Sequence, residues 1–281
     1  MRHMPRLLLL LCLPWLGGCE RAFFATLNLR ATTPVEHVSY GPAEHQAIDV
    51  FLPRTRAGAT APVVVFFYGG RWQEGRRADY AFVGEALAAR GVLTFVADYR
   101  HYPAVRFPGF MHDAAQAVAW VHAHAADYGG DVRRLHLAGH SAGAHLAALL
   151  ATDARYLGAV GLQPRQLRGV IGIAGPYDFL PLTDDDLKRV FGPESGWRES
   201  QPIEFVDGDE PPFLLLYGAR DRSVGPHNSA NLAAKLRAAG VAVDHRVYPD
   251  PGHVRILAAI RYPALAPTLE DVVAFVHGPS G

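Results

Sequence analysis

The feature of this sequence that most constrains its fold is a regular alternation of short apolar runs with helical patterns from residue 35 onward. Compact runs rich in Val, Leu and Phe, bounded by Gly or Pro, are typical of strands buried on both faces of a sheet. Such strands are predicted at Val63–Phe67, Val92–Ala97, Leu135–Ala138, Val170–Ala174, Phe213–Tyr217 and Val241–Val247. Two earlier runs, Val35–Tyr40 and Ala47–Leu52, alternate apolar with polar residues, which predicts half-buried strands at a sheet edge.

Helical patterns separate the later strands: Asp79–Arg90, Phe110–Tyr128, Ala142–Ala151, His227–Ala239 and Thr268–His277. Helices interleaved among the last six strands predict one α/β domain over residues 35–278, built on an eight-stranded, mostly parallel, doubly wound sheet with helices on both faces. The one long interruption, residues 175–211, is rich in Pro, Gly and acidic residues. Because a connection this long is usually functional, we interpret it as a small cap insertion over the site.

The composition excludes two classes of protein. Of 281 residues, 49% are hydrophobic and 19% charged, which is ordinary globular composition and excludes a mainly disordered chain. The 27 basic residues equal the 27 acidic ones in number. This balance argues against a nucleic-acid-binding protein, because such proteins normally have a strongly basic surface.

The first residues have the pattern of an export signal. Arg2 and Arg6 precede the apolar run Leu7–Leu13, and small residues precede Cys19. This arrangement predicts a signal peptide over residues 1–18 followed by a tether over residues 19–34. The stretch Leu-Gly-Gly-Cys ending at Cys19 resembles the lipobox of bacterial lipoproteins, in which that cysteine is acylated; an ordinary signal peptide is the alternative.

A lipid on Cys19 implies a particular location. Two acyl chains hold a protein on a membrane where one chain binds only marginally. We therefore expect an exported protein anchored through Cys19 on the periplasmic side of a bacterial membrane, and Glu20 after the cysteine favours the outer membrane in Gram-negative lipoproteins. Without the lipid, the same export signal leads to a periplasmic or secreted protein.

One motif indicates the chemistry. Residues 139–143 read Gly-His-Ser-Ala-Gly, directly after a predicted strand and before a predicted helix. In this strand–turn–helix setting, Gly-x-Ser-x-Gly places a serine at the apex of a sharp turn, with its hydroxyl clear of the sheet. The motif predicts Ser141 as a nucleophile; a helix N-cap serine is the alternative interpretation.

A neutral serine needs a general base, and catalytic groups of parallel sheets gather at the carboxyl ends of strands. Asp221 follows the strand Phe213–Tyr217, and His253 lies on the loop after the last predicted strand. The order Ser141, Asp221, His253 is the order of α/β-hydrolases. Asp250 and Asp244 lie close to His253 in the sequence and remain alternatives for the acid. Asp178 also lies at a strand end, and we interpret it as structural.

The oxyanion of the reaction needs backbone N–H donors. Ala142, which follows the predicted nucleophile, supplies one. The others are expected from the loop after Val63–Phe67, where residues 68–72 read Tyr-Gly-Gly-Arg-Trp. Paired glycines let a backbone approach a substrate closely, so Gly70 and Arg71 are the predicted donors; a plain Gly-Gly turn is the alternative.

With these motifs in place, residues from about 35 to 277 resemble the esterase/lipase branch of the α/β-hydrolase fold, near carboxylesterases related to feruloyl esterases, kynurenine formamidase and isoprenylcysteine methylesterase. Residues 68–72 are similar to the His-Gly-Gly-x-Trp oxyanion motif, and Asp98–Arg100 to a following Asp-Tyr-Arg. The departure is Tyr68, where the family usually has a histidine that braces the loop. The resemblance implies that a tyrosine hydroxyl takes over this bracing.

The sequence thus predicts a serine hydrolase that cleaves small carboxylic esters, with short acyl groups, through Ser141, His253 and Asp221, and without a metal or organic cofactor. A linear-amide hydrolase with the same triad is the alternative. A third interpretation is a surface lipoprotein that keeps the fold only to bind a partner.

The acidic run Asp184–Asp186 is expected to begin a solvated helix rather than to bind a cation. The aromatic residues Trp72, Tyr177 and Trp197 fit either a substrate pocket or core packing.

Overall fold

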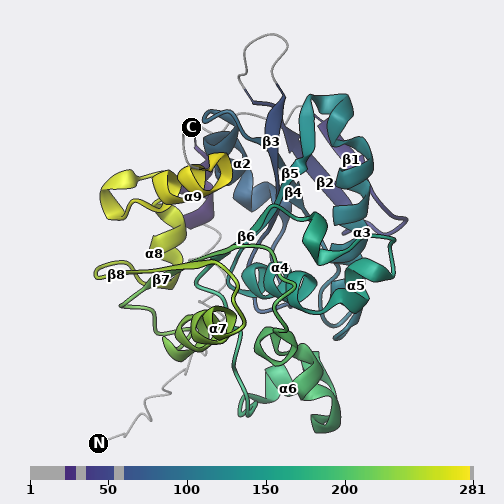
Figure 1. Ribbon diagram of the computed structural model, residues 1–281, viewed down its shortest axis with the longest axis vertical. Helices are drawn as coiled ribbons and strands as arrows, with labels where there is room; N and C mark the ends of the chain where they lie inside the picture. The colour runs from purple at the N-terminus through teal and green to yellow at the C-terminus, as the bar shows by residue number, and fades with distance from the viewer. Residues whose placement is uncertain (1–22, 30–35, 54–59, 279–281) are drawn as a thin grey trace, which may run out of the picture.

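A computed structural model describes residues 23–29, 36–53 and 60–278. Its centre is an eight-stranded sheet with the order β1-β2-β4-β3-β5-β6-β7-β8 (Figure 1). The strands are β1 Glu36–Ser39, β2 Ala47–Phe51, β3 Ala61–Phe67, β4 Leu93–Ala97, β5 Gly130–His140, β6 Gly169–Ile173, β7 Phe213–Gly218 and β8 Val243–Tyr248. Strand β1 pairs with β2, and β2 with β4, in antiparallel orientation. The remaining neighbours in the sheet order, β4-β3-β5-β6-β7-β8, are all parallel.

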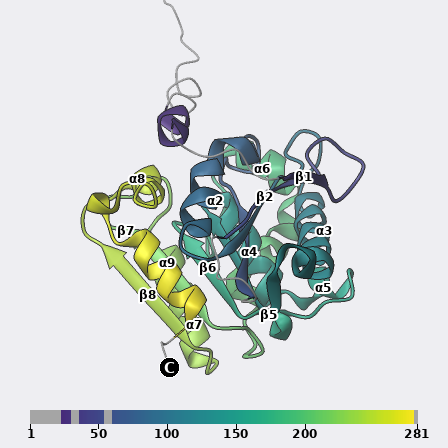
Figure 2. The same ribbon diagram turned by 90° about the horizontal axis from the view of Figure 1, so that it is seen from above.

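Helices cover both faces of the sheet, as Figure 2 shows from above. Helices α2 and α9 contact each other, and α3, α4 and α5 contact one another. The α-helices are α2 Ala81–Ala88, α3 Gly109–His124, α4 Ala142–Thr152, α5 Ala154–Gly158, α6 Asp185–Phe191, α7 His227–Ala238, α8 His253–Ala258 and α9 Thr268–His277. The 3₁₀ segments are η1 Arg77–Tyr80, η2 Ala125–Tyr128, η3 Pro164–Gln166, η4 Glu194–Ser200, η5 Pro202–Phe205 and η6 Pro263–Leu265. The α/β-hydrolase fold predicted from the sequence is confirmed.

Two strands differ from the predicted burial. All five residues of β2 are buried, although the alternating pattern predicts one wet face. The polar residue there, Asp49, is buried because its carboxylate pairs with Arg77 from η1 and with His37 Nδ1 of β1 at 2.6 Å. Strand β8, predicted to be buried on both faces, is instead the partly exposed edge of the sheet, because it pairs only with β7.

Several helical segments differ from those that the sequence predicts. The predicted helix Asp79–Arg90 is divided into η1 and α2, and the short helices α5 and α8 are absent from the prediction. Helix α8 spans only six residues and begins at His253, in a segment for which the sequence predicts a loop. Helices this short carry too few turns to show a periodic apolar face.

The insertion over residues 175–211 contains α6, η4 and η5 and packs on the loop that follows β3. The ring centroids of Phe191 and Trp72 lie 4.8 Å apart. Arg71 in the loop after β3 pairs with Asp184 at 2.8 Å, and Ser200 O accepts a hydrogen bond from His145 Nε2 at 2.7 Å. The insertion therefore contacts the loop predicted to bind the oxyanion.

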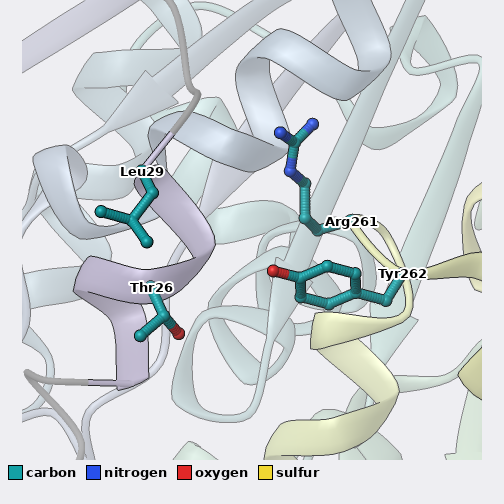
Figure 3. A pocket seen from close by; sticks show the side chains of 4 residues that line it. All are labelled: Thr26, Leu29, Arg261 and Tyr262. Atoms are coloured by element: carbon teal, nitrogen blue, oxygen red, sulfur yellow. The ribbon is translucent and has the colours of Figure 1, made fainter.

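The N-terminal end of the described chain is also packed. Residues 23–28, which the sequence places in the tether, form a helix whose Asn28 side chain donates to Asp79 O at 2.8 Å and accepts from Phe82 N at 2.9 Å. A hollow of about 480 Å³ lies beside this helix and is lined by Thr26, Leu29, Arg261 and Tyr262. Figure 3 shows these four side chains. The predicted signal peptide, Cys19 and residues 30–35 lie outside the described residues.

Candidate active site

Ser141 stands at the turn between β5 and α4, with φ of 54° and ψ of −122°. A non-glycine residue with positive φ is strained, and here the strain lifts the hydroxyl out of the sheet. The flanking glycines are required by space: a Cβ on Gly139 would lie 2.3 Å from Gly143 C, and one on Gly143 would lie 2.0 Å from Phe67 O. Ser141 N donates to Ile173 O at 2.9 Å, which fixes the turn to β6.

His253 brings a base to this serine from the start of α8. Its Nε2 lies 2.8 Å from Ser141 Oγ, and its Nδ1 lies 2.7 Å from Asp221 Oδ2. The His253 side chain is 15% exposed, so the imidazole edge is within reach of solvent and substrate. The geometry is that of a serine hydroxyl donating to Nε2 while Nδ1–H donates to a carboxylate.

Asp221 follows β7, and its side chain is fully buried. Burial raises the pKa of this carboxyl, but the hydrogen bonds from His253 and from the backbone N–H groups of Val224 and Ser223 outweigh it, so the pKa lies below its usual value. The two amides donate to Oδ1 at 3.0 and 2.8 Å. The carboxylate is thus held ionised and oriented toward the imidazole.

The alternative carboxylates have other partners. Asp250 is exposed and pairs with Arg220 at 2.9 Å. Asp244 pairs with Arg246, and Asp178 accepts from Asn231 Nδ2 at 2.6 Å. Among the described residues, Asp221 is the only one whose carboxylate hydrogen-bonds to the His253 imidazole.

The loop after β3 approaches the serine from the other side. A Cβ on Gly69 would lie 3.0 Å from Ser141 Cβ, and a Cβ on Gly70 (φ 129°) would lie 2.0 Å from Glu74 O. Arg71 follows with φ of 54°. Within the described part of the chain, no protein acceptor takes the N–H groups of Gly70, Arg71 or Ala142. These donors are therefore available to a ligand beside Ser141.

Tyr68 anchors this loop. Its ring is fully buried, its Oη lies 3.0 Å from His101 Nε2, and its carbonyl accepts from Tyr99 Oη at 2.9 Å. Tyr80 Oη accepts from Gly69 N at 3.2 Å. The expectation that a tyrosine hydroxyl braces the loop agrees with these contacts.

The motif Asp98–Arg100 supports the same region. Asp98 pairs with Arg77 and accepts from Arg77 N at 2.7 Å, while Arg100 makes a bidentate pair with the buried Asp113. The sequence does not reveal Asp113 or His101 as partners, because they come from a helix and a loop with no motif of their own.

The aromatic residues left open by the sequence are buried. Trp72, Tyr177 and Trp197 are 4%, 0% and 8% exposed. Trp72 Nε1 donates to His145 Nδ1 at 3.2 Å, and its ring packs on Phe179 of the insertion. All three therefore pack in the core.

Neither a metal cluster nor a membrane span is found in the described residues. No group of three or more His, Cys, Asp or Glu side chains there has the geometry to bind a metal ion. Asp184 is instead the N-cap of α6, accepting from Asp186 N at 2.8 Å, as expected for an acidic helix start. No helix in the same part of the chain is both long and apolar enough to cross a bilayer.

Most of the described chain matches a known protein family. Residues 48–236 match the model of the BD-FAE family. This region contains the turn that carries Ser141, the loop after β3 and Asp221. The chain belongs to the BD-FAE family. Since the match ends before residue 253, the histidine is placed by the structure and not by the family match.

Relatives of this BD-FAE chain are named esterases. Esterase LipC of Mycobacterium tuberculosis is 33% identical over 77% of this chain and 58% of its own length. Isoprenylcysteine alpha-carbonyl methylesterase ICME of Arabidopsis thaliana is 27% identical over 98% of this chain and 70% of its own length. The chain spans 55 to 62% of the length of three of the curated relatives it matches.

Solved structures show the same fold. Esterase B from Lactobacillus rhamnosis superposes with a TM-score of 0.77 over 92% of this chain and 91% of that chain, at 22% identity. At this identity the likeness concerns the fold alone.

Proposed function

We propose that this BD-FAE chain is a serine hydrolase that cleaves carboxylic esters through Ser141, His253 and Asp221. The observation that carries the proposal is the pair of contacts made by one imidazole, 2.8 Å to the serine hydroxyl and 2.7 Å to a buried carboxylate. A nucleophile, a base within hydrogen-bond reach and a third group that orients the base are the arrangement that acyl transfer requires.

The reaction proceeds in two halves. Ser141 Oγ attacks the ester carbonyl carbon while His253 Nε2 takes the hydroxyl proton, and His253 then gives this proton to the departing alcohol. Asp221 holds the tautomer with hydrogen on Nδ1 and stabilises the imidazolium. In the second half, water attacks the acyl carbon, its proton passes to His253 and then to Ser141 Oγ, and the carboxylic acid leaves.

The tetrahedral oxyanion of each half is stabilised by the N–H groups of Gly70, Arg71 and Ala142. Support comes from the positive φ at Gly70 and Arg71, from their unoccupied donors among the described residues, and from the place of Ala142 at the start of α4. A helix N-terminus adds a favourable dipole at the developing charge. No step of this mechanism calls for a metal or an organic cofactor.

The test is hydrolysis of p-nitrophenyl esters from acetate to decanoate by the purified protein beside Ser141→Ala. We expect turnover on short acyl chains, since the insertion packs its aromatic side chains into the core beside the site, and a loss of at least about 10³-fold in the variant. A folded protein that turns over no ester and does not react with a fluorophosphonate probe would contradict the proposal.

The runner-up function is hydrolysis of linear amides with the same triad, since ester and amide cleavage share these roles. Rates on matched ester and anilide pairs with one acyl group separate the two. A ratio strongly in favour of the ester supports the proposal, and the named methylesterase relatives point in this direction. A ratio near one, with good activity on the amide, favours the runner-up.

We also propose that the protein is exported and anchored to the periplasmic side of the outer membrane through a lipid on Cys19. The support is the lipobox-like sequence that ends at this residue. Cys19→Ala is expected to move the protein from the membrane fraction to the periplasm, with Cys12→Ala as the control variant. A protein that fractionates identically with and without Cys19 is not lipid-anchored there.

A further inference from the structure

His140, the residue before the proposed nucleophile, contacts His253 at the start of α8 and faces the loop after β3. It ends β5 and is only 3% exposed. Its Nε2 lies 3.0 Å from the backbone oxygen of His253, and the two imidazole centroids are 4.9 Å apart. Its Nδ1 faces the loop after β3, since a Cβ on Gly69 would lie 3.1 Å from this nitrogen.

The protonation of His140 follows from these contacts. A carbonyl oxygen only accepts, so Nε2 must carry the hydrogen and donate it to His253 O. Burial, and then the neighbouring His253, lower the pKa of His140 to about 3, against the opposing influence of the carbonyl and Asp221. His140 therefore stays neutral beside a residue that gains and loses a proton during turnover.

The histidine is a poor choice for stability alone. Its Nδ1 is buried and has no hydrogen-bond partner among the described residues. A buried polar atom left unpaired costs stability, and an apolar side chain of similar volume avoids that cost. What the imidazole adds is the single hydrogen bond from Nε2 to the backbone of the proposed base.

We propose that His140 is a positioning residue whose Nε2–H tethers His253 to the nucleophile's turn, and that this tether matters most in the acyl-enzyme. The inference rests on the proposed function. Before acylation, the Ser141 hydroxyl itself holds His253 at 2.8 Å. After acylation Oγ carries the acyl group and no hydrogen, so it no longer donates to Nε2. The hydrogen bonds to Asp221 and from His140 then remain to position the base that must activate water.

The kinetic consequence is specific to the second half of the reaction. Loss of the tether slows deacylation more than acylation, so the acyl-enzyme accumulates. Because kcat then reports deacylation and kcat/KM reports acylation, kcat and KM fall together while kcat/KM changes little. If the base is displaced by a fraction of an ångström, the rate of deacylation is expected to fall roughly tenfold.

The test compares His140→Gln with His140→Asn in the full protein. The glutamine Nε2 reaches the position of the imidazole Nε2 and donates to His253 O, whereas the asparagine amide is one methylene too short. We expect kcat for p-nitrophenyl acetate within about threefold of wild type for His140→Gln. For His140→Asn we expect kcat and KM each lowered roughly tenfold, with a larger pre-steady-state burst of p-nitrophenol.

His140→Leu and His136→Leu separate positioning from folding. Both histidines are buried on β5, but His136 Nδ1 bonds Arg134 O, away from the triad. His140→Leu should behave as His140→Asn with a melting temperature within about 4 °C of wild type, while His136→Leu keeps wild-type kcat and burst.

Two results would overturn the tether. Either His140→Asn and His140→Leu keep the wild-type kcat, or their kcat falls with KM unchanged and no added burst. A wild-type protein that turns over no ester and resists the fluorophosphonate probe would instead overturn the proposed function itself.

Discussion

The hydroxyl of Tyr68 and the Nε2 of His101 share a hydrogen bond of 3.0 Å beneath the candidate oxyanion loop. Both side chains are buried, and burial, with the neighbouring His45, lowers the pKa of His101 to about 4, so the imidazole is neutral at ordinary pH. The sequence resemblance implies a histidine at this place in related esterases, where this chain has Tyr68. The pair therefore places an imidazole beneath the same loop, but from a different position in the sequence.

Tyr68→Phe tests whether this pair holds the loop. The change removes one hydroxyl and leaves His101 Nε2 buried without its partner, which costs about 1–3 kcal/mol. The carbonyl of Tyr68 keeps its bond from Tyr99, so the loop is expected to loosen rather than unfold. We expect a lower melting temperature and a loss of kcat of less than about tenfold. Unchanged stability would show that the hydroxyl is not a brace.

Asp221→Asn and Asp250→Asn distinguish the buried carboxylate from its exposed neighbour. The asparagine amide at 221 cannot accept from Nδ1–H as a carboxylate does and favours the wrong imidazole tautomer, so kcat is expected to fall by about 10⁴-fold. Asp250 contacts Arg220 at the surface, and its change should alter kcat less than about twofold. The reverse order of effects would identify Asp250 as the acid.

The sequence could predict that Ser141, Asp221 and His253 lie together, because each follows a strand and the carboxyl ends of parallel strands meet at one edge of the sheet. It could not predict the burial of β2. The sequence pattern indicates that Asp49 faces solvent, and only the fold shows that Arg77 pairs with its carboxylate. The hydrogen bond from His140 to the backbone of His253 cannot be predicted from the sequence for the same reason. A histidine at the end of a strand gives no sign of which carbonyl its ring will meet 113 residues later.

Gly70→Ala probes the oxyanion loop through its backbone. At φ of 129°, a Cβ would lie 2.0 Å from Glu74 O, so the loop must shift to admit it. Displacing one oxyanion donor costs on the order of 10²–10³ in kcat. The control is Gly240→Ala, at φ of 83° with nothing within 4 Å of the added Cβ, where only the left-handed conformation is penalised, by roughly 1–2 kcal/mol.

The two glycine variants are compared by steady-state kinetics at a temperature well below both melting transitions. Gly70→Ala is expected to lose turnover out of proportion to its stability, whereas Gly240→Ala loses stability and keeps kcat. Equal kcat values for the two folded variants would remove Gly70 from the oxyanion site.

The buried histidines make the fold sensitive to mild acid. His136 is 1% exposed, and burial lowers its pKa to about 4, below the value of about 6.5 in an unfolded chain. Above pH 6.5 both states are neutral, and the stability is fully present. As the pH falls from 6.5 toward 4, the unfolded chain binds the proton first, so the free energy of unfolding decreases.

Replacing His136 removes this dependence at one site. Between pH 7.5 and pH 5, the free energy of unfolding of the wild type should fall by about 2 kcal/mol more than that of His136→Leu. Urea denaturation followed by circular dichroism at the two pH values measures the difference. His136→Gln packs differently but also lacks the titrating ring, so it should give the same change. A difference between wild type and variant that is constant with pH would mean that His136 titrates alike in the folded and unfolded chains.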